Sequence, residues 1–238
     1  MPLAYRLRAW SQAMMQGIAG RIWCVTLAAG LLAAGAVHAA EGQLLDQERT
    51  LLYVPADLDQ AKGKHPIVVA LSPGGRPYDM IQAWRAAADA HGWFVLASKE
   101  FHNGIDADPI LGALMQDVKE LTKTQPVDVA KVIAAGFSGG AMGAHMLANQ
   151  YPWQVVAVVA NCGVISDGDR AKDDRYPWSK KVVFLASPGD MNYARMQEDE
   201  RWLRRRAWAT DWIEFEGGHV MAPAAIYEKA AEWLASNL

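Results

Sequence analysis

A serine placed between glycines is the clearest sign of chemistry in this sequence. Residues 136–140 read Gly-Phe-Ser-Gly-Gly, a Gly-x-Ser-x-Gly pattern centred on Ser138. The apolar stretch 131–137 predicts a strand that leads into the pattern, and the small residues of 139–150 predict a helix that follows it. On so tight a turn the serine hydroxyl is exposed above the sheet, and the flanking positions must lack large side chains. We therefore expect Ser138 to be a nucleophile.

A serine nucleophile needs two further groups. Its hydroxyl reacts poorly at neutral pH, so an imidazole must take the proton and a carboxylate must orient that imidazole. Asp190 follows the predicted strand 181–187, and His219 follows the predicted strand 211–216. Both residues come at the carboxyl end of a strand, where the active-site loops of such sheets lie. We expect Ser138, His219 and Asp190 to form a catalytic triad.

Other residues compete for these roles. Asp211 and Glu216 also lie near His219 in sequence, but Asp211 begins its predicted strand, at the wrong end of the sheet. Glu216 belongs to the same strand that carries His219, so Asp190 is the favoured acid. His145 comes seven residues after Ser138, about two helical turns further on. We interpret His145 as a packed or surface histidine.

The reaction also needs hydrogen-bond donors for a developing oxyanion. The backbone amide of Gly139, directly after the serine, is one expected donor. The second should come from the loop 72–75, Ser-Pro-Gly-Gly, which follows the predicted strand 66–71. The proline of this loop has no N–H to donate. The sequence leaves open whether Gly74 or Gly75 is the donor.

The order serine, aspartate, histidine along the chain is that of the α/β-hydrolases. From about residue 50 to residue 238 the chain resembles small secreted esterases of the polyhydroxybutyrate-depolymerase and feruloyl-esterase branch. The resemblance is carried by residues 136–140, by Gly-Asp-Met-Asn-Tyr at 189–193 and by Gly-Gly-His at 217–219. It implies Ser138 as nucleophile, His219 as general base and then acid, and Asp190 as the orienting acid. The loop 72–75 departs from the His-Gly form common in the family.

Apolar runs alternate with helical patterns along the rest of the chain. This alternation predicts a single α/β domain over 40–238, with a mostly parallel central sheet of about seven strands, helices on both faces and no large lid. The expected strands are 50–55, 66–71, 93–98, 131–137, 155–160, 181–187 and 211–216. The expected helices are 78–91, 110–123, 139–150, 192–209 and 223–238.

A few residues near the expected site are candidates for substrate contact. His102 and Asn103 follow the strand 93–98 at the correct end of the sheet, although an ordinary loop position is the alternative. Tyr193, just after the expected acid, lines an acyl pocket or packs in the core. Cys162 carries no implied thiol chemistry, because the predicted mature chain has no second cysteine to resolve it.

The first residues predict a targeting segment. Residues 22–40 contain no Asp, Glu, Lys or Arg and follow Arg6, Arg8 and Arg21. Small or β-branched residues before Ala40 predict cleavage after Ala39, so 1–39 reads as a secretory signal peptide, with Met14 or Met15 as alternative starts. The alternative is an uncleaved membrane anchor. We expect an exported protein, periplasmic or secreted, with no stable membrane span after cleavage.

Composition excludes several classes of function. The formal net charge of −3 becomes −6 without residues 1–39, which argues against nucleic-acid binding. The sequence has no metal-ligand cluster and no phosphate-loop or dinucleotide motif, so we expect neither metal nor cofactor. The predicted function is hydrolysis of a small or soluble carboxylic ester through an acyl-enzyme on Ser138. The alternatives are a peptidase or amidase with the same triad, and a secreted binding protein that retains the scaffold without turnover.

Overall fold

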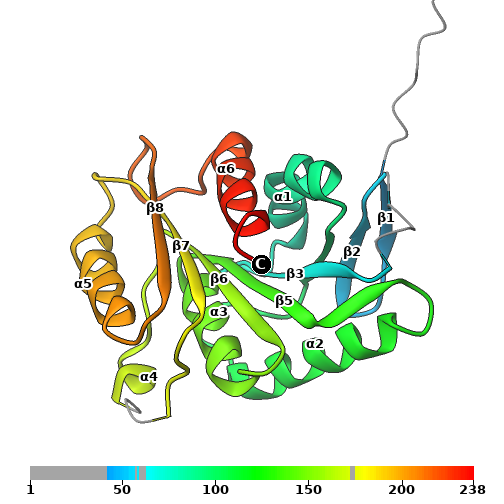
Figure 1. The fold of residues 1–238 in the computed structure, drawn as a ribbon, viewed down its shortest axis with the longest axis horizontal. Helices are drawn as coiled ribbons and strands as arrows, with labels where there is room; N and C mark the ends of the chain where they lie inside the picture. The colour runs from blue at the N-terminus through cyan, green and yellow to red at the C-terminus, as the bar shows by residue number, and fades with distance from the viewer. Residues whose placement is uncertain (1–41, 57, 59–62, 172–174) are drawn as a thin grey trace, which may run out of the picture. The chain divides into compact units, whose positions relative to one another are not determined.

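One mixed β-sheet organises the part of the chain that the structure describes. The computed structural model describes residues 42–56, 58, 63–171 and 175–238, and the predicted signal peptide 1–39 lies outside them. Within those ranges no helix is both long and apolar enough to cross a membrane. The strands are β1 (Gln43–Asp46), β2 (Thr50–Val54), β3 (His65–Leu71), β4 (Phe94–Ser98), β5 (Val127–Phe137), β6 (Val155–Asn161), β7 (Lys181–Ala186) and β8 (Ala209–Glu214) (Figure 1). The helices are α1 (Pro77–His91), α2 (Ala107–Leu121), α3 (Gly139–Gln150), α4 (Asp167–Ala171), α5 (Tyr193–Arg204) and α6 (Ala224–Ala235).

The strand order decides where the loops meet. The sheet runs β1-β2-β4-β3-β5-β6-β7-β8. The β1–β2 and β2–β4 pairs are antiparallel, and every pair from β4 to β8 is parallel. Parallel strands end at the same edge of a sheet, so the loops that follow β3, β5, β7 and β8 gather there.

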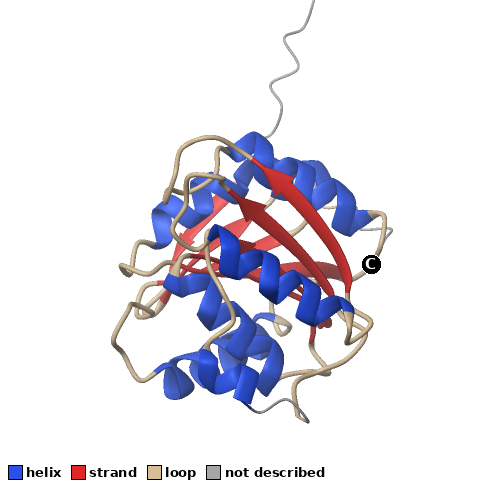
Figure 2. Ribbon diagram, turned by 90° about the vertical axis from the view of Figure 1, so that its left-hand side faces the viewer, coloured by secondary structure: helices blue, strands red, loops and turns tan. Residues whose placement is uncertain are grey.

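Helices cover both faces of the sheet, as the alternating sequence pattern predicts. Helices α1 and α6 pack on one face, and α2, α3 and α5 pack on the other (Figures 1 and 2). On the first face the rings of Trp84 and Tyr227 meet edge to face, with centroids 5.2 Å apart. The strands between the two layers are apolar on both sides, which is why β3 and β4 read as continuous hydrophobic runs.

The prediction of about seven strands was one strand short. The described sheet has eight strands, and the additional one is β1 at its edge. This strand has four residues, most of them exposed, and it pairs only with β2. A short edge strand with one covered face has too few positions to show a periodic pattern, so the sequence did not reveal it.

Boundaries around α5 also differ from the prediction. The predicted helix 192–209 ends at Arg204, and β8 begins at Ala209 rather than at 211. Between them Ala207 has a φ of 58°, in the left-handed region that ends helices. The short helix α4, in the connection between β6 and β7, was not predicted either.

His145 is packed inside the fold, on the inward face of α3. Its side chain is fully buried, and its Nδ1 lies 2.7 Å from the hydroxyl of Tyr176. Burial lowers the pKa of His145 to about 3, because an imidazolium would lose its hydration there. Between about pH 3 and pH 6.5 the imidazole is therefore neutral in the folded protein, whereas it is protonated in the unfolded chain.

This burial predicts a pH dependence of stability. The folded pKa lies below the unfolded value, so the contribution to stability is complete above about pH 6.5 and is lost as the pH falls, by about 1.4 kcal/mol per pH unit. In chemical denaturation between pH 6 and pH 4, His145→Gln should show a shallower loss of unfolding free energy than the wild type. Tyr176→Phe is the control, since it removes the hydrogen bond but keeps the titrating ring and hence the slope. Equal slopes for the wild type and His145→Gln would contradict the assignment.

Candidate active site

The turn after β5 places Ser138 above the end of the strand. Ser138 has φ 55° and ψ −120°, a strained conformation for a residue with a side chain. The two glycines of the motif allow the turn to close. A Cβ on Gly136 would lie 2.1 Å from the carbonyl carbon of Gly140, and a Cβ on Gly140 would lie 2.1 Å from the carbonyl oxygen of Leu71 in β3. The motif spacing thus follows from the close approach of three backbone segments.

The structure brings Ser138, His219 and Asp190 into one hydrogen-bonded line. His219 Nε2 lies 2.8 Å from Ser138 Oγ, and His219 Nδ1 lies 3.0 Å from both carboxylate oxygens of Asp190. These distances fit a neutral imidazole that donates from Nδ1 to the carboxylate and accepts the serine proton at Nε2. The Asp190 side chain is fully buried, whereas 27% of the His219 side chain is exposed. The line therefore runs from a buried charge to an accessible hydroxyl.

Short hydrogen bonds hold the acid in place. The backbone N–H of Asn192 donates to Asp190 Oδ1 at 2.7 Å, and the N–H of Asp190 donates to the carbonyl of Ser187 at 2.9 Å. Ser187 Oγ in turn accepts from the N–H of Gly218 at 2.8 Å, next to His219. One serine side chain thereby ties the acid loop to the histidine loop.

Two loops near Ser138 carry the backbone amides that the sequence indicates as candidate oxyanion donors. Gly139, which follows the serine, is the first residue of α3, so its N–H lies at the positive end of the helix dipole. In the loop after β3, the N–H of Gly75 donates to the carbonyl of Ser72 at 3.4 Å. The N–H of Gly74 donates to Ser72 Oγ, also at 3.4 Å, but Gly74 lines the cleft beside His219 whereas Gly75 does not. Of the two glycines left open by the sequence, the geometry favours Gly74.

Of the three candidates for substrate contact, the structure places only Asn103 in the cleft. Its N–H donates to the carbonyl of Pro73 at 2.9 Å, and its amide lies so close to the serine turn that a Cβ on Gly139 would be 1.8 Å from Asn103 Oδ1. His102 pairs through its backbone with Gly74, but its side chain is not part of the cleft wall. His102 therefore braces the loop that carries Gly74.

Tyr193 lies apart from the cleft. Its hydroxyl donates to Glu214, and its ring packs edge to face against Trp212 with centroids 5.5 Å apart. Tyr193 is therefore a packing residue between α5 and β8, the second of the two interpretations that the sequence left open.

The cleft next to the triad has a volume of about 590 Å³. One part of its wall is apolar, and another part carries Asn103 and the ion pair of Arg76 with Asp79, whose charged atoms are 2.6 Å apart. The ring of Phe137 packs against the imidazole of His219, with centroids 5.2 Å apart. The wall consists of Ser72, Pro73, Gly74, Arg76, Asp79, Asn103, Phe137, His219, Val220 and Met221.

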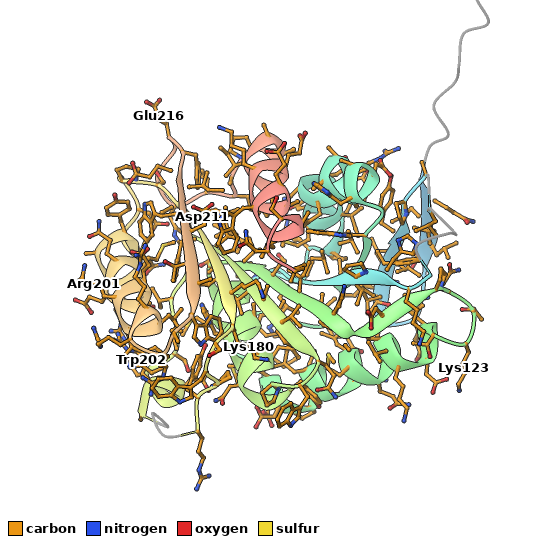
Figure 3. The ribbon with its side chains drawn as sticks, in the orientation of Figure 1. Lys123, Lys180, Arg201, Trp202, Asp211 and Glu216 are labelled. Atoms are coloured by element: carbon orange, nitrogen blue, oxygen red, sulfur yellow. The ribbon has the colours of Figure 1, made fainter. Side chains whose placement is uncertain are left out.

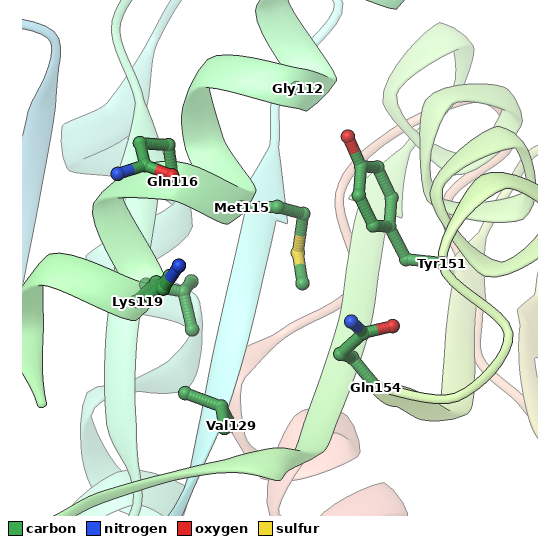
Figure 4. A pocket seen from close by; sticks show the side chains of 8 residues that line it. Gly112, Met115, Gln116, Lys119, Val129, Tyr151 and Gln154 are labelled. Atoms are coloured by element: carbon green, nitrogen blue, oxygen red, sulfur yellow. The ribbon is translucent and has the colours of Figure 1, made fainter.

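A second cavity, of about 420 Å³, lies between α2 and the connection from α3 to β6 (Figure 4). Met115, Tyr151 and Gln154 point toward its centre, and Val129 closes it from the start of β5. It is at the amino ends of the strands, on the opposite edge of the sheet from the triad. We therefore assign it no part in the chemistry of Ser138.

The hydrogen bonds of His219 go to Asp190 and Ser138 and not to either alternative acid. Asp211 lies within β8, and Glu216 points outward beyond the end of that strand (Figure 3). Cys162, the free cysteine of the described chain, is buried, and its thiol lies 3.7 Å from the carbonyl of Gly218. Burial raises the pKa of this thiol, and the neighbouring Asp190 carboxylate raises it further. A protonated buried thiol is a poor nucleophile.

Sequence reasoning missed the residues that hold the triad from behind. Asn161 is the last residue of β6, Ser187 directly follows β7, and both carry a buried polar side chain. No spacing in the sequence marks them, although a buried polar residue at the carboxyl end of an apolar strand is a usable signal. In the residues that the structure describes, no group of three or more His, Cys, Asp or Glu side chains is arranged to hold a metal.

The sequence matches no protein-family profile and no curated protein. Solved structures are similar in fold. The chain superimposes on the esterase PE8 with a TM-score of 0.61 at 17% identity, covering 84% of this chain and 100% of that one. The carboxylesterase of Bacillus cereus gives a TM-score of 0.61 at 19% identity over 79% of this chain and 94% of that one. An S-formylglutathione hydrolase from Agrobacterium tumefaciens gives a TM-score of 0.58 at 14% identity, and the match covers 83% of this chain and 95% of that one.

These similarities agree with the internal geometry. The parallel sheet with its antiparallel second strand, the serine turn after β5, and the acid and histidine after β7 and β8 occur together here. The chain therefore has the α/β-hydrolase fold.

Proposed function

We propose that this protein is a serine hydrolase that cleaves carboxylic esters through an acyl-enzyme on Ser138. The observation that carries the proposal is the contact of His219 Nε2 with Ser138 Oγ at 2.8 Å, together with the buried carboxylate of Asp190 on the other ring nitrogen. A serine, an imidazole and a buried carboxylate in this geometry activate a hydroxyl at neutral pH.

The reaction proceeds in two halves. Ser138 Oγ attacks the ester carbonyl while its proton passes to His219 Nε2, and the imidazolium is stabilised by Asp190. The tetrahedral intermediate collapses, the carbon–oxygen bond to the alcohol breaks, and the alcohol leaves with that proton. Water then loses a proton to His219 and attacks the acyl group, which releases the acid and restores Ser138.

Two backbone amides stabilise the oxyanion in both halves. Gly139 N–H and Gly74 N–H are the donors that the geometry supports, and one such donor is typically worth about 10²–10³ in rate. Asn103, which lies against Gly139, is the candidate for contact with the bound ester.

The cleft supports a small or soluble ester. A volume of about 590 Å³ accommodates a compact ligand, and the apolar wall around Phe137, Val220 and Met221 suits an acyl chain. Helix α4, in the connection between β6 and β7, is bound to α3 through a 2.9 Å hydrogen bond from Asn149 to Asp169, away from the triad. Among the residues that the structure describes, α4 is therefore not part of the cleft wall.

The first test titrates the nucleophile. A fluorophosphonate probe should label the wild type in a 1:1 ratio and leave Ser138→Ala unlabelled. Among p-nitrophenyl esters of increasing acyl length, short chains should turn over fastest, and the corresponding p-nitroanilide should react far more slowly. A wild type that neither labels nor hydrolyses any ester would defeat the proposal and favour a binding protein. Faster anilide than ester turnover would favour an amidase.

The second test identifies the acid. Asp190→Asn should lower kcat by about 10³–10⁴, because the amide cannot stabilise the imidazolium and favours the wrong tautomer. Asp211→Asn and Glu216→Gln are matched controls, because each removes a carboxylate in β8 or just after it without touching Asp190. Both should keep kcat within about threefold. A large loss in either control, with activity retained in Asp190→Asn, would reassign the acid.

We also propose that the protein is exported and that residues 1–39 are removed. The charge-free stretch 22–40 after three arginines supports this proposal. Mass spectrometry of protein expressed with its full leader should find an N-terminus at Ala40 in the exported fraction. Recovery of the intact N-terminus in membranes would contradict it and favour the anchor.

A further inference from the structure

We propose that Asn161 is a positioning residue that holds the three triad loops at their working separation. The inference rests on the proposed function, since it concerns the same triad, but Asn161 itself touches none of the three catalytic side chains. It is the last residue of β6, between the strands that lead to Ser138 and to Asp190, and none of its surface is exposed.

The backbone of Asn161 holds the nucleophile turn. Its carbonyl accepts the N–H of Ser138 at 2.8 Å. This bond extends the parallel pairing of β5 and β6, in which Phe137 is aligned with Asn161, by one residue into the strained turn. The strained conformation of Ser138 is thus tied directly to the end of β6.

The side chain of Asn161 reaches the other two loops. Its Nδ2 donates to the carbonyl of Leu185 at 3.2 Å, in the strand that leads to Asp190. Its Oδ1 accepts the backbone N–H of Ala222 at 2.9 Å, three residues after His219. One side chain therefore bridges the acid strand and the histidine loop.

The Leu185 carbonyl and the Ala222 N–H are both backbone groups, and their chemistry limits which side chain can bridge them. A backbone N–H only donates and a carbonyl only accepts, so the side chain between them must present one acceptor and one donor. The primary amide of Asn161 meets that need. Its Oδ1 also accepts the hydroxyl of Tyr227 at 3.0 Å, on α6.

Loss of the Asn161 bridge should lower the catalytic rate by displacing His219 from Ser138 and Asp190. Without the side chain of Asn161, the Ala222 N–H loses its buried partner, the Leu185 carbonyl keeps the Cys162 N–H at 3.0 Å, and the histidine loop is no longer tied to β7 at this point. Misplacement of a catalytic group by about 1 Å can lower a rate by about 10²-fold. The loss should fall mainly on kcat, because proton transfer by His219 is more sensitive to a small displacement of its loop than the apolar contacts of Val220 and Met221 with the ester are.

The experiment compares Asn161→Ala and Asn161→Asp with Tyr227→Phe. Tyr227→Phe removes one donor from the same Oδ1 but leaves the bridge between Leu185 and Ala222, so it is the matched structural control. Asn161→Asp keeps the size and one acceptor but turns the donor into a second acceptor against the Leu185 carbonyl, and it keeps the test open if Asn161→Ala does not fold. Each variant is measured for thermal stability, kcat and KM on a short p-nitrophenyl ester, and rate of fluorophosphonate labelling.

The expected result separates catalysis from stability. Both Asn161 variants should lose about 10- to 100-fold in kcat and in labelling rate with KM changed less than threefold, whereas Tyr227→Phe should keep kcat within twofold even if it melts at a similarly reduced temperature. A kcat that follows melting temperature across all three variants, or Asn161 variants within twofold of the wild type, would overturn the proposal.

A spectroscopic measurement distinguishes failure of the positioning role of Asn161 from failure of the proposed hydrolase function. The proton that His219 shares with Asp190 should give a downfield ¹H resonance in the wild type, whether or not any ester is turned over. Its shift or loss in the Asn161 variants, with retention in Tyr227→Phe, supports the positioning role. An unchanged resonance in folded Asn161 variants overturns it, while an unlabelled wild type defeats only the hydrolase assignment.

Discussion

The strained turn at Ser138 is the constraint around which the rest of the site is arranged. A residue with a side chain at φ 55° costs about 1–3 kcal/mol, and the surrounding structure must supply that energy. It does so through the packing of α3 against β3 and β5 and through the bond from Ser138 to the end of β6. Because the turn is fixed from three sides, the serine hydroxyl is presented to His219 without a change of backbone conformation.

Burial differs along the triad, and this difference matters electrostatically. The carboxylate of Asp190 has no exposed surface and depends on the Asn192 N–H and on His219 for its hydrogen bonds. A buried carboxylate stabilises a neighbouring imidazolium more strongly than an exposed one, because less water screens it. The His219 side chain is partly exposed, and its Nε2 contacts Ser138 Oγ. In the proposed mechanism the buried charge of Asp190 is thus kept apart from the ring nitrogen that transfers the proton.

The proposed oxyanion donors come from two distant parts of the sequence. The N–H of Gly139 is placed by the helix that starts directly after the serine, while Gly74 is placed by the loop after β3. The backbone pairing of Gly74 with His102 and the bond from Asn103 to Pro73 connect this loop to the one after β4. Three consecutive strands of the parallel sheet therefore contribute to the same small volume.

Much of this could be predicted from the order of residues, because the features concerned are local. The Gly-x-Ser-x-Gly turn, the alternation of apolar strands with helices, and the positions of Asp190 and His219 after strands each depend on neighbours in sequence. The edge strand β1 could not be predicted, since its pairing with β2 leaves little trace in four mostly exposed residues.

The tertiary structure decided what depends on segments far apart in the chain. Only the folded chain distinguishes Gly74 from Gly75, sets Tyr193 against Trp212 and brings the side chain of Asn161 between Leu185 and Ala222. The sequence by itself determined which groups are candidates for a serine nucleophile, its base and its acid, and at which edge of a sheet they lie. The distances between these groups were decided by the register of the parallel strands. That register depends on packing across the whole sheet, which no local sequence pattern encodes.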